Sequence, residues 1–377
     1  MPFSLRLPSR RTPVPLPVVA ATLAVGALGA VVATLLHLPL PLLLGPIVST
    51  AAAAITRVKL FGQAPALPGV FRSWSIPVIG VSIGGAFHPG LLEQAVRWWP
   101  SVIALALIVP IAQAMGYLIY RRLGGFDPAT SFFGAIPGGL ITAIAMGEEA
   151  GGNVAMTTML QFMRLILTIT LVPLAFTIIT GGAVGSAAGA SFGGTDQSAS
   201  VLEIALLLAL AAIGAVVGER LKLPAAVVTG PLLVSGAAHL AGLTDAVPPQ
   251  WMIGLTQLFV GTALGARFAG MGRSMFGRAL VLAALNVCAT LLLGLGTAYA
   301  LHFWVTEPTD AIFLALAPGG VAEMSLVAVS LQVSVVYVSA HHVLRIVLSV
   351  TLARIFAQRI TAATEAFAHS AAPAPGE

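Results

Sequence analysis

The chain carries the stretch GAIPGGLIT at residues 134–142 and the related stretch ALAPGGVAE at residues 315–323. An arginine follows each stretch, Arg164 in the first half and Arg345 in the second, and its distance from the proline is the same in both copies. The proline, the two glycines and the arginine of the first copy are each separated from their counterparts in the second copy by the same number of residues. A helix-breaking tripeptide that recurs in this way, followed each time by the same charged residue, indicates an internal duplication.

The composition places this chain in a lipid bilayer. Hydrophobic residues make up 58% of its 377 residues and charged residues only 8%, and the mean hydropathy is +0.99. Water-soluble domains have roughly a quarter of their residues charged. The net charge of +5 comes from few residues, so it bears on the orientation of loops rather than on nucleic-acid binding. We expect the bilayer, and no nucleic acid, as a partner.

Twelve apolar segments, six in each half, are the candidate membrane helices. Most of them approach the ~20 residues that span a ~30 Å hydrocarbon core. They cover residues 16–36, 38–56, 70–87, 99–120, 129–147 and 154–181, then 202–218, 223–242, 251–266, 279–303, 309–331 and 335–358. The pattern predicts an all-α polytopic membrane protein. Its parts are a cytoplasmic N-terminal segment (1–15), a first repeat (16–181), a linker (182–200), a second repeat (201–360) and a flexible C-terminal tail (361–377).

The duplication extends beyond the Pro-Gly-Gly stretches. A Leu-Pro pair followed by Gly-Pro occurs in both halves, and a Gly, Gly, Phe set recurs at the same offset as the Pro-Gly-Gly stretches. The matched residues are Leu38, Pro39, Gly45 and Pro46 with Leu223, Pro224, Gly230 and Pro231, and Gly80, Gly84 and Phe87 with Gly261, Gly265 and Phe268. The whole chain therefore consists of two copies of one unit.

The basic residues predict how the two copies are oriented. If each Pro-Gly-Gly segment enters and leaves on one side of the membrane, each repeat has five crossings, and 15 of the 18 Lys and Arg residues lie in the cytoplasm. Arg97 alone is outside, and Arg164 and Arg345 are in the membrane. The positive-inside rule favours this arrangement over twelve crossings. An odd number of crossings inverts the second repeat and leaves both termini in the cytoplasm.

The Pro-Gly-Gly stretches are predicted to open the helical hydrogen-bond ladder. Pro137 and Pro318 have no N–H, and the two glycines after each proline, Gly138 with Gly139 and Gly319 with Gly320, allow backbone angles that other residues avoid. Backbone opened inside a membrane must line a cavity or be buried in protein. The freed N–H groups can hold an anion and the freed carbonyls a cation. The alternative is a tight packing kink without a ligand.

Arg164 and Arg345 are predicted to lie near the centre of the bilayer. Arg164 is about 11 residues into its segment, or ~16 Å at ~1.5 Å per residue, and Arg345 holds the equivalent position. A guanidinium at that depth needs a partner, a carbonyl or water. Two interpretations remain open. Each arginine either ties down the opened carbonyls of its own repeat or helps to hold an anionic substrate, and its five donors permit both.

The two copies differ at two positions that could carry a proton. Thr142 in the first copy corresponds to Glu323 in the second, and Gln161 corresponds to His342. Glu323 is the only carboxylate deep in an apolar segment. Glu323 and His342 are therefore the candidate proton carriers. The alternative for Glu323 is a neutralising pair with Arg345.

No enzyme motif is present in the sequence. It has no phosphate-binding Gly-x-x-x-x-Gly-Lys loop, no serine nucleophile elbow and no His-x-x-x-His pair. A single cysteine, Cys288, excludes an intramolecular disulfide and a multi-cysteine metal site. We expect neither enzymatic activity, nor a cofactor, nor a metal.

Two copies of a unit with Leu-Pro-x5-Gly-Pro early and Pro-Gly-Gly late resemble the AbrB duplication of the bacterial membrane AbrB proteins. The resemblance covers about residues 16–360. Members of that family are labelled regulators of gene expression or ammonia monooxygenases, and they are unrelated to the soluble DNA-binding regulator of the same name. The family is also distantly similar to cation/proton antiporters and anion transporters with inverted repeats and broken helices. The resemblance implies transport and a location in the bacterial cytoplasmic (inner) membrane.

The sequence thus favours a secondary transporter of a small anionic solute, coupled to protons through Glu323 or His342. A membrane sensor that binds a ligand at the same site without moving it is the alternative. The predicted site consists of Pro137, Gly138, Gly139, Thr142, Gln161 and Arg164 from the first repeat and Pro318, Gly319, Gly320, Glu323, His342 and Arg345 from the second. The solute, the coupling ion, the direction of transport and any homo-oligomer are left open.

Overall fold

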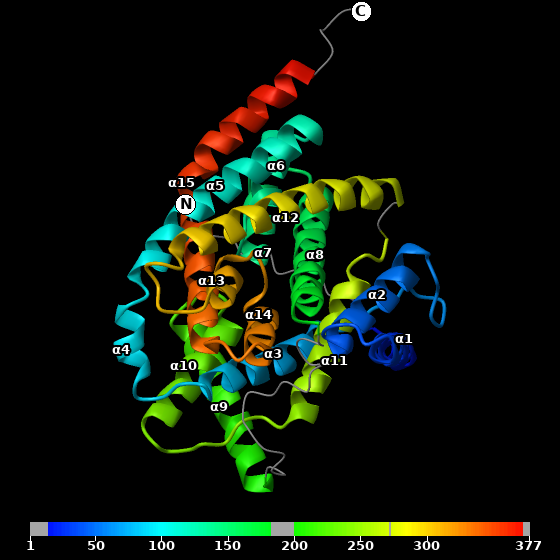
Figure 1. Ribbon diagram of the computed structural model, residues 1–377. Coiled ribbons are helices and arrows are strands. Elements are labelled where there is room, and N and C mark those ends of the chain that lie inside the picture. Colours follow the sequence, from blue (N-terminus) through cyan, green and yellow to red (C-terminus); the bar gives the residue numbers. More distant parts are fainter. Residues whose placement is uncertain (1–13, 182–199, 271–272, 372–377) are drawn as a thin grey trace, which may run out of the picture.

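A computed structural model of the chain describes residues 14–181, 200–270 and 273–371 (Figure 1). Throughout these ranges the regular structure is helical, and no strand is formed beyond an isolated bridge between Leu60 and Gln63. The predicted all-α fold is confirmed. In the described part of the chain, six helices are long and apolar enough to cross a membrane.

The helices follow the predicted segments. The first repeat contains α1 (Leu16–Leu35), α2 (Pro41–Ile55), α3 (Gly69–Gly84), α4 (Leu91–Val96), α5 (Trp99–Leu118), a π-helical turn η1 (Ile119–Leu123), α6 (Pro128–Ala135), α7 (Leu140–Glu149) and α8 (Val154–Thr180). The second contains α9 (Val201–Arg220), α10 (Ala226–Leu240), α11 (Gln250–Ala266), α12 (Arg273–Leu301), α13 (Thr309–Leu316), α14 (Val321–Ser330) and α15 (Val335–Ala371). The six long apolar helices are α1, α5 with η1, α8, α9, α12 and α15.

The third helix of each repeat packs against the second helix of the other repeat. Helix α3 packs closely on α10, and α11 packs closely on α2. Glycine has no Cβ atom, and one added at Gly80 would lie only 3.0 Å from Cβ of Pro231. One added at Gly261 would lie only 3.1 Å from Cβ of Pro46. The repeated glycines and prolines therefore form the same close contact twice, each time between one repeat and the other. Only glycine permits so near an approach of two helices.

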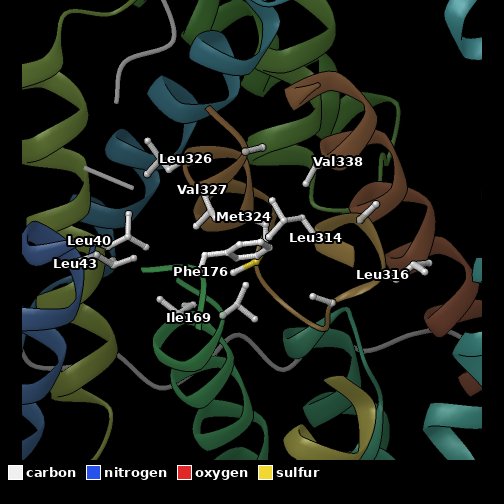
Figure 2. Close-up of a cluster of buried hydrophobic side chains, with 14 of the residues drawn as sticks. Leu40, Leu43, Ile169, Phe176, Leu314, Leu316, Met324, Leu326, Val327 and Val338 are labelled. Atoms are coloured by element: carbon white, nitrogen blue, oxygen red, sulfur yellow. The ribbon is translucent and has the colours of Figure 1, made fainter. Parts of the chain in front are cut away.

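The helices form two bundles (Figure 1). The first three helices of each repeat, α1–α3 and α9–α11, pack together, and α5–α8 pack with α12–α15. The contacts between the bundles that extend over several residues join α3 to α14 and α15 and α2 to α8. Figure 2 shows part of this interface, where Leu43 of α2 and Leu40 directly before it lie near Phe176 of α8 and Val327 of α14. We call α1–α3 with α9–α11 the first bundle and the remainder the second bundle.

The long helices α8 and α15, which are equivalent in the duplication, run in opposite directions. Helix α6 runs parallel to α8, because Gln161 bonds to the carbonyl of Phe133 and Arg164 to that of Ile136. Helix α6 runs antiparallel to α15, because Ala129 donates to Thr364 Oγ1 whereas Gly138 lies against Ile346. Opposite directions of equivalent helices are what an inverted duplication requires. The membrane orientation of the repeats remains a prediction.

The C-terminal part of α15 differs from the predicted flexible tail, since the helix continues to Ala371. Residues 361–371 are rich in alanine, which favours helix. They also have partners in the first repeat. Thr364 accepts a hydrogen bond from Ala129 N at 3.1 Å, and the guanidinium of Arg121 lies 4.3 Å from the ring centroid of Phe367. The predicted linker and N-terminal segment fall almost entirely outside the described residues, as do residues 372–377.

Candidate functional site

Both Pro-Gly-Gly stretches separate two short helices. Helix α6 ends at Ala135 and α7 begins at Leu140, while α13 ends at Leu316 and α14 begins at Val321. The two breaks use different backbone angles. Gly139 has φ 69°, in the left-handed region that favours glycine, whereas Gly320 has φ −78° and ψ 147°. The ladder is open at both predicted positions.

Each broken segment doubles back on itself. In the first repeat, Asn153 N donates to Thr130 Oγ1 at 2.7 Å, which joins the chain just after α7 to the start of α6. In the second repeat, α13 follows the direction of α15, since Leu314 lies beside His342 and Ala317 beside Arg345. The following α14 runs back along α15. Each pair of half-helices is therefore a hairpin with its break at the tip.

Arg164 binds the opened end of α6. Its Nη1 donates to the carbonyl of Ile136 and, at 3.4 Å, to that of Ala135, and its Nη2 donates to Gln161 Oε1 at 2.9 Å. Gln161 Nε2 in turn donates to the carbonyl of Phe133 at 2.6 Å. Both side chains are buried. Carbonyls that have lost their helical partners are thus satisfied from α8.

Arg345 repeats this arrangement in the second half. Its Nη1 donates to the carbonyl of Ala317, its Nη2 to that of Gly319 at 2.6 Å, and the same Nη2 lies 2.8 Å from His342 Nδ1. His342 Nε2 lies 2.8 Å from the carbonyl of Leu314. In the duplication, Ala317 and Leu314 are the counterparts of Ile136 and Phe133. The tether to the opened carbonyls, one of the two interpretations open from the sequence, is therefore formed in both repeats.

The contacts of His342 favour a neutral imidazole. Nε2 carries a hydrogen toward the carbonyl of Leu314, and Nδ1 accepts from Arg345 Nη2 at 2.8 Å rather than donating to the more distant carbonyl of Gly319 at 3.2 Å. His342 is then a neutral imidazole with both nitrogens in use. A second proton would place an N–H against a guanidinium. This makes His342 the weaker of the two candidate proton carriers.

Glu323 lies at the beginning of α14, and its carboxylate folds back over the helix N-terminus. A Cβ atom at Gly320 would lie 3.4 Å from Oε1 of Glu323 and even closer to Oε2. Among the residues that the structure describes, no hydrogen bond or ion pair joins Glu323 to Arg345. The geometry gives no support to a neutralising pair between them.

Three charged side chains are buried in the described part of the chain, namely Arg164, Glu323 and Arg345. All three come from the broken segments or from the helices that tether them. The first repeat contributes no carboxylate to this set, since the position of Glu323 is held there by Thr142, which is partly exposed and lies over Gly139. With His342 neutral, the buried set carries two positive charges and one negative charge.

Two further residues of this region were not singled out from the sequence. Ser349 is 1% exposed, and its Oγ has no hydrogen-bond partner and lies against the first break, near Gly138. Its counterpart in the duplication is Thr168, whose hydroxyl bonds to the Arg164 carbonyl. The presence of a hydroxyl residue at this position in both repeats could have identified Ser349 from the sequence. Arg72 of α3 is partly buried in the first bundle, and its Nε has no hydrogen-bond partner among the described residues.

These features define a polytopic α-helical membrane protein made of two broken-helix units. The model of the family described as "Transition state regulatory protein AbrB" matches residues 51–361, and the chain belongs to the AbrB family. The chain is 27% identical over 350 residues to "Uncharacterized protein YhjN" of Bacillus subtilis (strain 168), covering 88% of this chain and 90% of the relative. It is 23% identical over 311 residues to "Putative regulator AbrB" of Escherichia coli (strain K12), covering 82% and 87%. The resemblance read from the sequence is confirmed.

Proposed function

We propose that this protein is a secondary transporter of a small anionic solute in the bacterial cytoplasmic membrane. The observation that carries the proposal is the set of three buried charges at two broken helices. Burying charge in a membrane protein is costly and marks substrate or ion pathways. The excess of positive charge favours an anionic solute. The protein would act without chemical conversion of the solute, so no catalytic residue is assigned.

The division into two bundles supports movement. Both broken segments belong to the second bundle, and the bundles meet through a limited apolar interface (Figure 2). Alternating access requires one bundle to move against the other while the site stays intact. Apolar contacts are not directional, so an interface rich in leucine, valine and phenylalanine side chains favours sliding. Helix tethers inside the second bundle would keep the site together.

Proton coupling is assigned to Glu323 rather than to His342. Glu323 is buried at the tip of the second hairpin and is not committed to an ion pair with Arg345. If one proton binds to Glu323 whenever one monovalent anion binds, the total charge of the site is unchanged. That balance favours symport of one proton with one monoanion.

The inverted orientation is part of the proposal and is supported by the antiparallel α8 and α15. Reporter fusions inserted between residues 182 and 200 and at the C-terminus test it. We expect the linker fusion to be active outside the cytoplasm and the C-terminal fusion inside. Two cytoplasmic signals would replace the inverted model with the parallel one.

The second candidate function is a membrane sensor, which the name of the Escherichia coli relative, a regulator, favours. A sensor would bind its ligand at the same residues without moving it. Uptake of labelled lactate, pyruvate and succinate into sealed proteoliposomes with an imposed pH gradient distinguishes the two. A transporter gives gradient-driven uptake that protein-free liposomes lack. Binding of a solute without uptake would assign the sensor role.

A further inference from the structure

The N-termini of α7 and α14 are equivalent in the duplication but are occupied differently. At α14, the carboxylate of Glu323 lies over Gly320. At α7, no side chain caps the helix, and no acidic residue lies in the first turn. Both helices are ten residues long. The first N–H groups of a helix lack partners inside the helix and attract negative charge.

An unpartnered hydroxyl borders the uncapped N-terminus of α7. Ser349 of α15 is 1% exposed, and its Oγ makes no hydrogen bond. A Cβ atom at Gly138 would lie 3.4 Å from this oxygen, so the hydroxyl faces the break directly before α7. Its counterpart Thr168 donates to the carbonyl of Arg164 at 2.9 Å and is satisfied. Leaving a buried hydroxyl unpaired costs free energy, which a ligand that accepts its hydrogen bond would recover.

We propose that the N-terminus of α7, with the hydroxyls of Thr142 and Ser349, binds the carboxylate group of a small monocarboxylate solute. This inference rests on the proposed transport function and locates its substrate. The anion would contact the first N–H groups of α7 rather than the guanidinium groups, because Arg164 and Arg345 are committed to the carbonyls of the breaks.

The chemical class follows from the second repeat and from the charges. There the protein itself places a carboxylate at the equivalent helix start, so the geometry of a half-helix in this fold accommodates that group. With Glu323 ionised, the buried charges Arg164, Arg345 and Glu323 sum to one positive charge. Binding of one proton with one monoanion leaves that sum unchanged, whereas binding of one proton with a dianion would lower it by one. The two repeats thus form a pair of carboxylate sites, one filled by Glu323 and one left for the solute.

Thr142→Glu tests the inference by giving the first repeat its own carboxylate. Thr142→Gln is the control, because glutamine has the size of glutamate but no charge. The full-length protein in detergent is unfolded thermally with and without lactate, pyruvate, succinate and inorganic phosphate. We expect lactate or pyruvate, and neither succinate nor phosphate, to raise the Tm of the unmodified chain. Thr142→Glu should abolish that rise, and Thr142→Gln should retain part of it.

Ser349→Ala tests the hydroxyl, with Ser82→Ala as the control. Ser82 is a buried serine of the first bundle that bonds within its own helix. Ser349→Ala should weaken monocarboxylate binding about fivefold, the size of one lost hydrogen bond. Ser82→Ala should leave it unchanged. These variants remain informative if Thr142→Glu does not fold.

Each result has a defined meaning. Monocarboxylate binding that survives both Thr142→Glu and Ser349→Ala would overturn this site while leaving transport intact. A Tm response to succinate or phosphate alone would overturn the monocarboxylate class. If none of the four solutes binds or is taken up by proteoliposomes, the proposed anion transport itself fails.

Discussion

The two broken segments of this protein are held by the same hydrogen-bond network but differ in the charge that they carry. In both, an arginine from the following long helix binds the opened carbonyls, and a neighbour one turn earlier completes the network. That neighbour is Gln161 in the first repeat and His342 in the second, and each bonds to its arginine and to a matched carbonyl. Thr142 and Glu323, by contrast, are equivalent in the duplication but differ in chemistry, since Thr142 is a neutral hydroxyl and Glu323 a buried carboxyl group. The comparison separates residues that hold the breaks from residues that give each break its charge.

Removal of the arginines should have the largest effect. Arg345→Ala would remove the charged donor from the carbonyls of Ala317 and Gly319, and Arg164→Ala would remove it from those of Ala135 and Ile136. Neutral donors stay near three of these carbonyls, since Gly319 N donates to that of Ala317 at 2.9 Å, His342 Nδ1 lies 3.2 Å from that of Gly319, and Gln161 Nε2 donates to that of Ile136 at 3.3 Å. Hydrogen bonds to charged groups contribute about 1.5–3 kcal/mol each, so we expect both variants to be severely destabilised. Thermal unfolding of the detergent-solubilised variants measures this.

Lysine at the same positions sharpens the test. Arg→Lys keeps the charge but lacks the planar fork that reaches two acceptors, so it should restore folding better than transport. Full stability and full activity of both alanine variants would show that the breaks do not depend on these tethers.

Glu323→Gln should abolish proton coupling with a smaller effect on stability. Glutamine keeps the shape of the side chain that lies over Gly320, and no ion pair with Arg345 is lost. We expect uptake driven by a pH gradient to disappear while exchange of solute for solute persists. Flux in proteoliposomes and thermal unfolding are measured together. An unstable variant whose folded fraction still couples to protons would rule out the coupling role.

The starts of the two hairpins give a prediction of intermediate size. Asp127 caps α6, because its Oδ1 accepts from Thr130 N at 2.7 Å, whereas no side chain caps α13 at Pro308. Asp127→Ala should therefore lower the free energy of unfolding by about 1 kcal/mol. Asp310→Ala, which removes an acid from the first turn of α13, is the control and should cost less. Equal losses would mean that charge, rather than the cap, stabilises α6.

His342→Gln should have the smallest effect. It installs the residue of the first repeat, whose amide makes both equivalent bonds, one to the carbonyl of Phe133 and one from Arg164. Stability and gradient-driven uptake should both stay close to those of the unmodified chain. Loss of proton coupling with normal folding would transfer the coupling role from Glu323 to His342.

Much of the framework was predictable from the sequence because it rests on local chemistry. Hydropathy identified the apolar segments, and Pro137 and Pro318 located the two breaks, since a missing N–H opens a helix wherever the chain lies. The constant offset revealed the duplication and paired Arg164 with Arg345. The continuation of α15 to Ala371 was not predicted, because its contacts with Ala129 and Arg121 join residues from opposite halves of the chain.

The sequence by itself determined that this chain is a duplicated helical membrane protein of the AbrB family with two broken segments, each followed by an arginine. Only the tertiary structure decided what those residues do. Whether a guanidinium faces a carbonyl or a carboxylate depends on how separate helices pack, and a sequence pattern does not contain that information. Packing committed Arg164 and Arg345 to the breaks, kept Glu323 apart from Arg345, and left Ser349 unpaired beside α7.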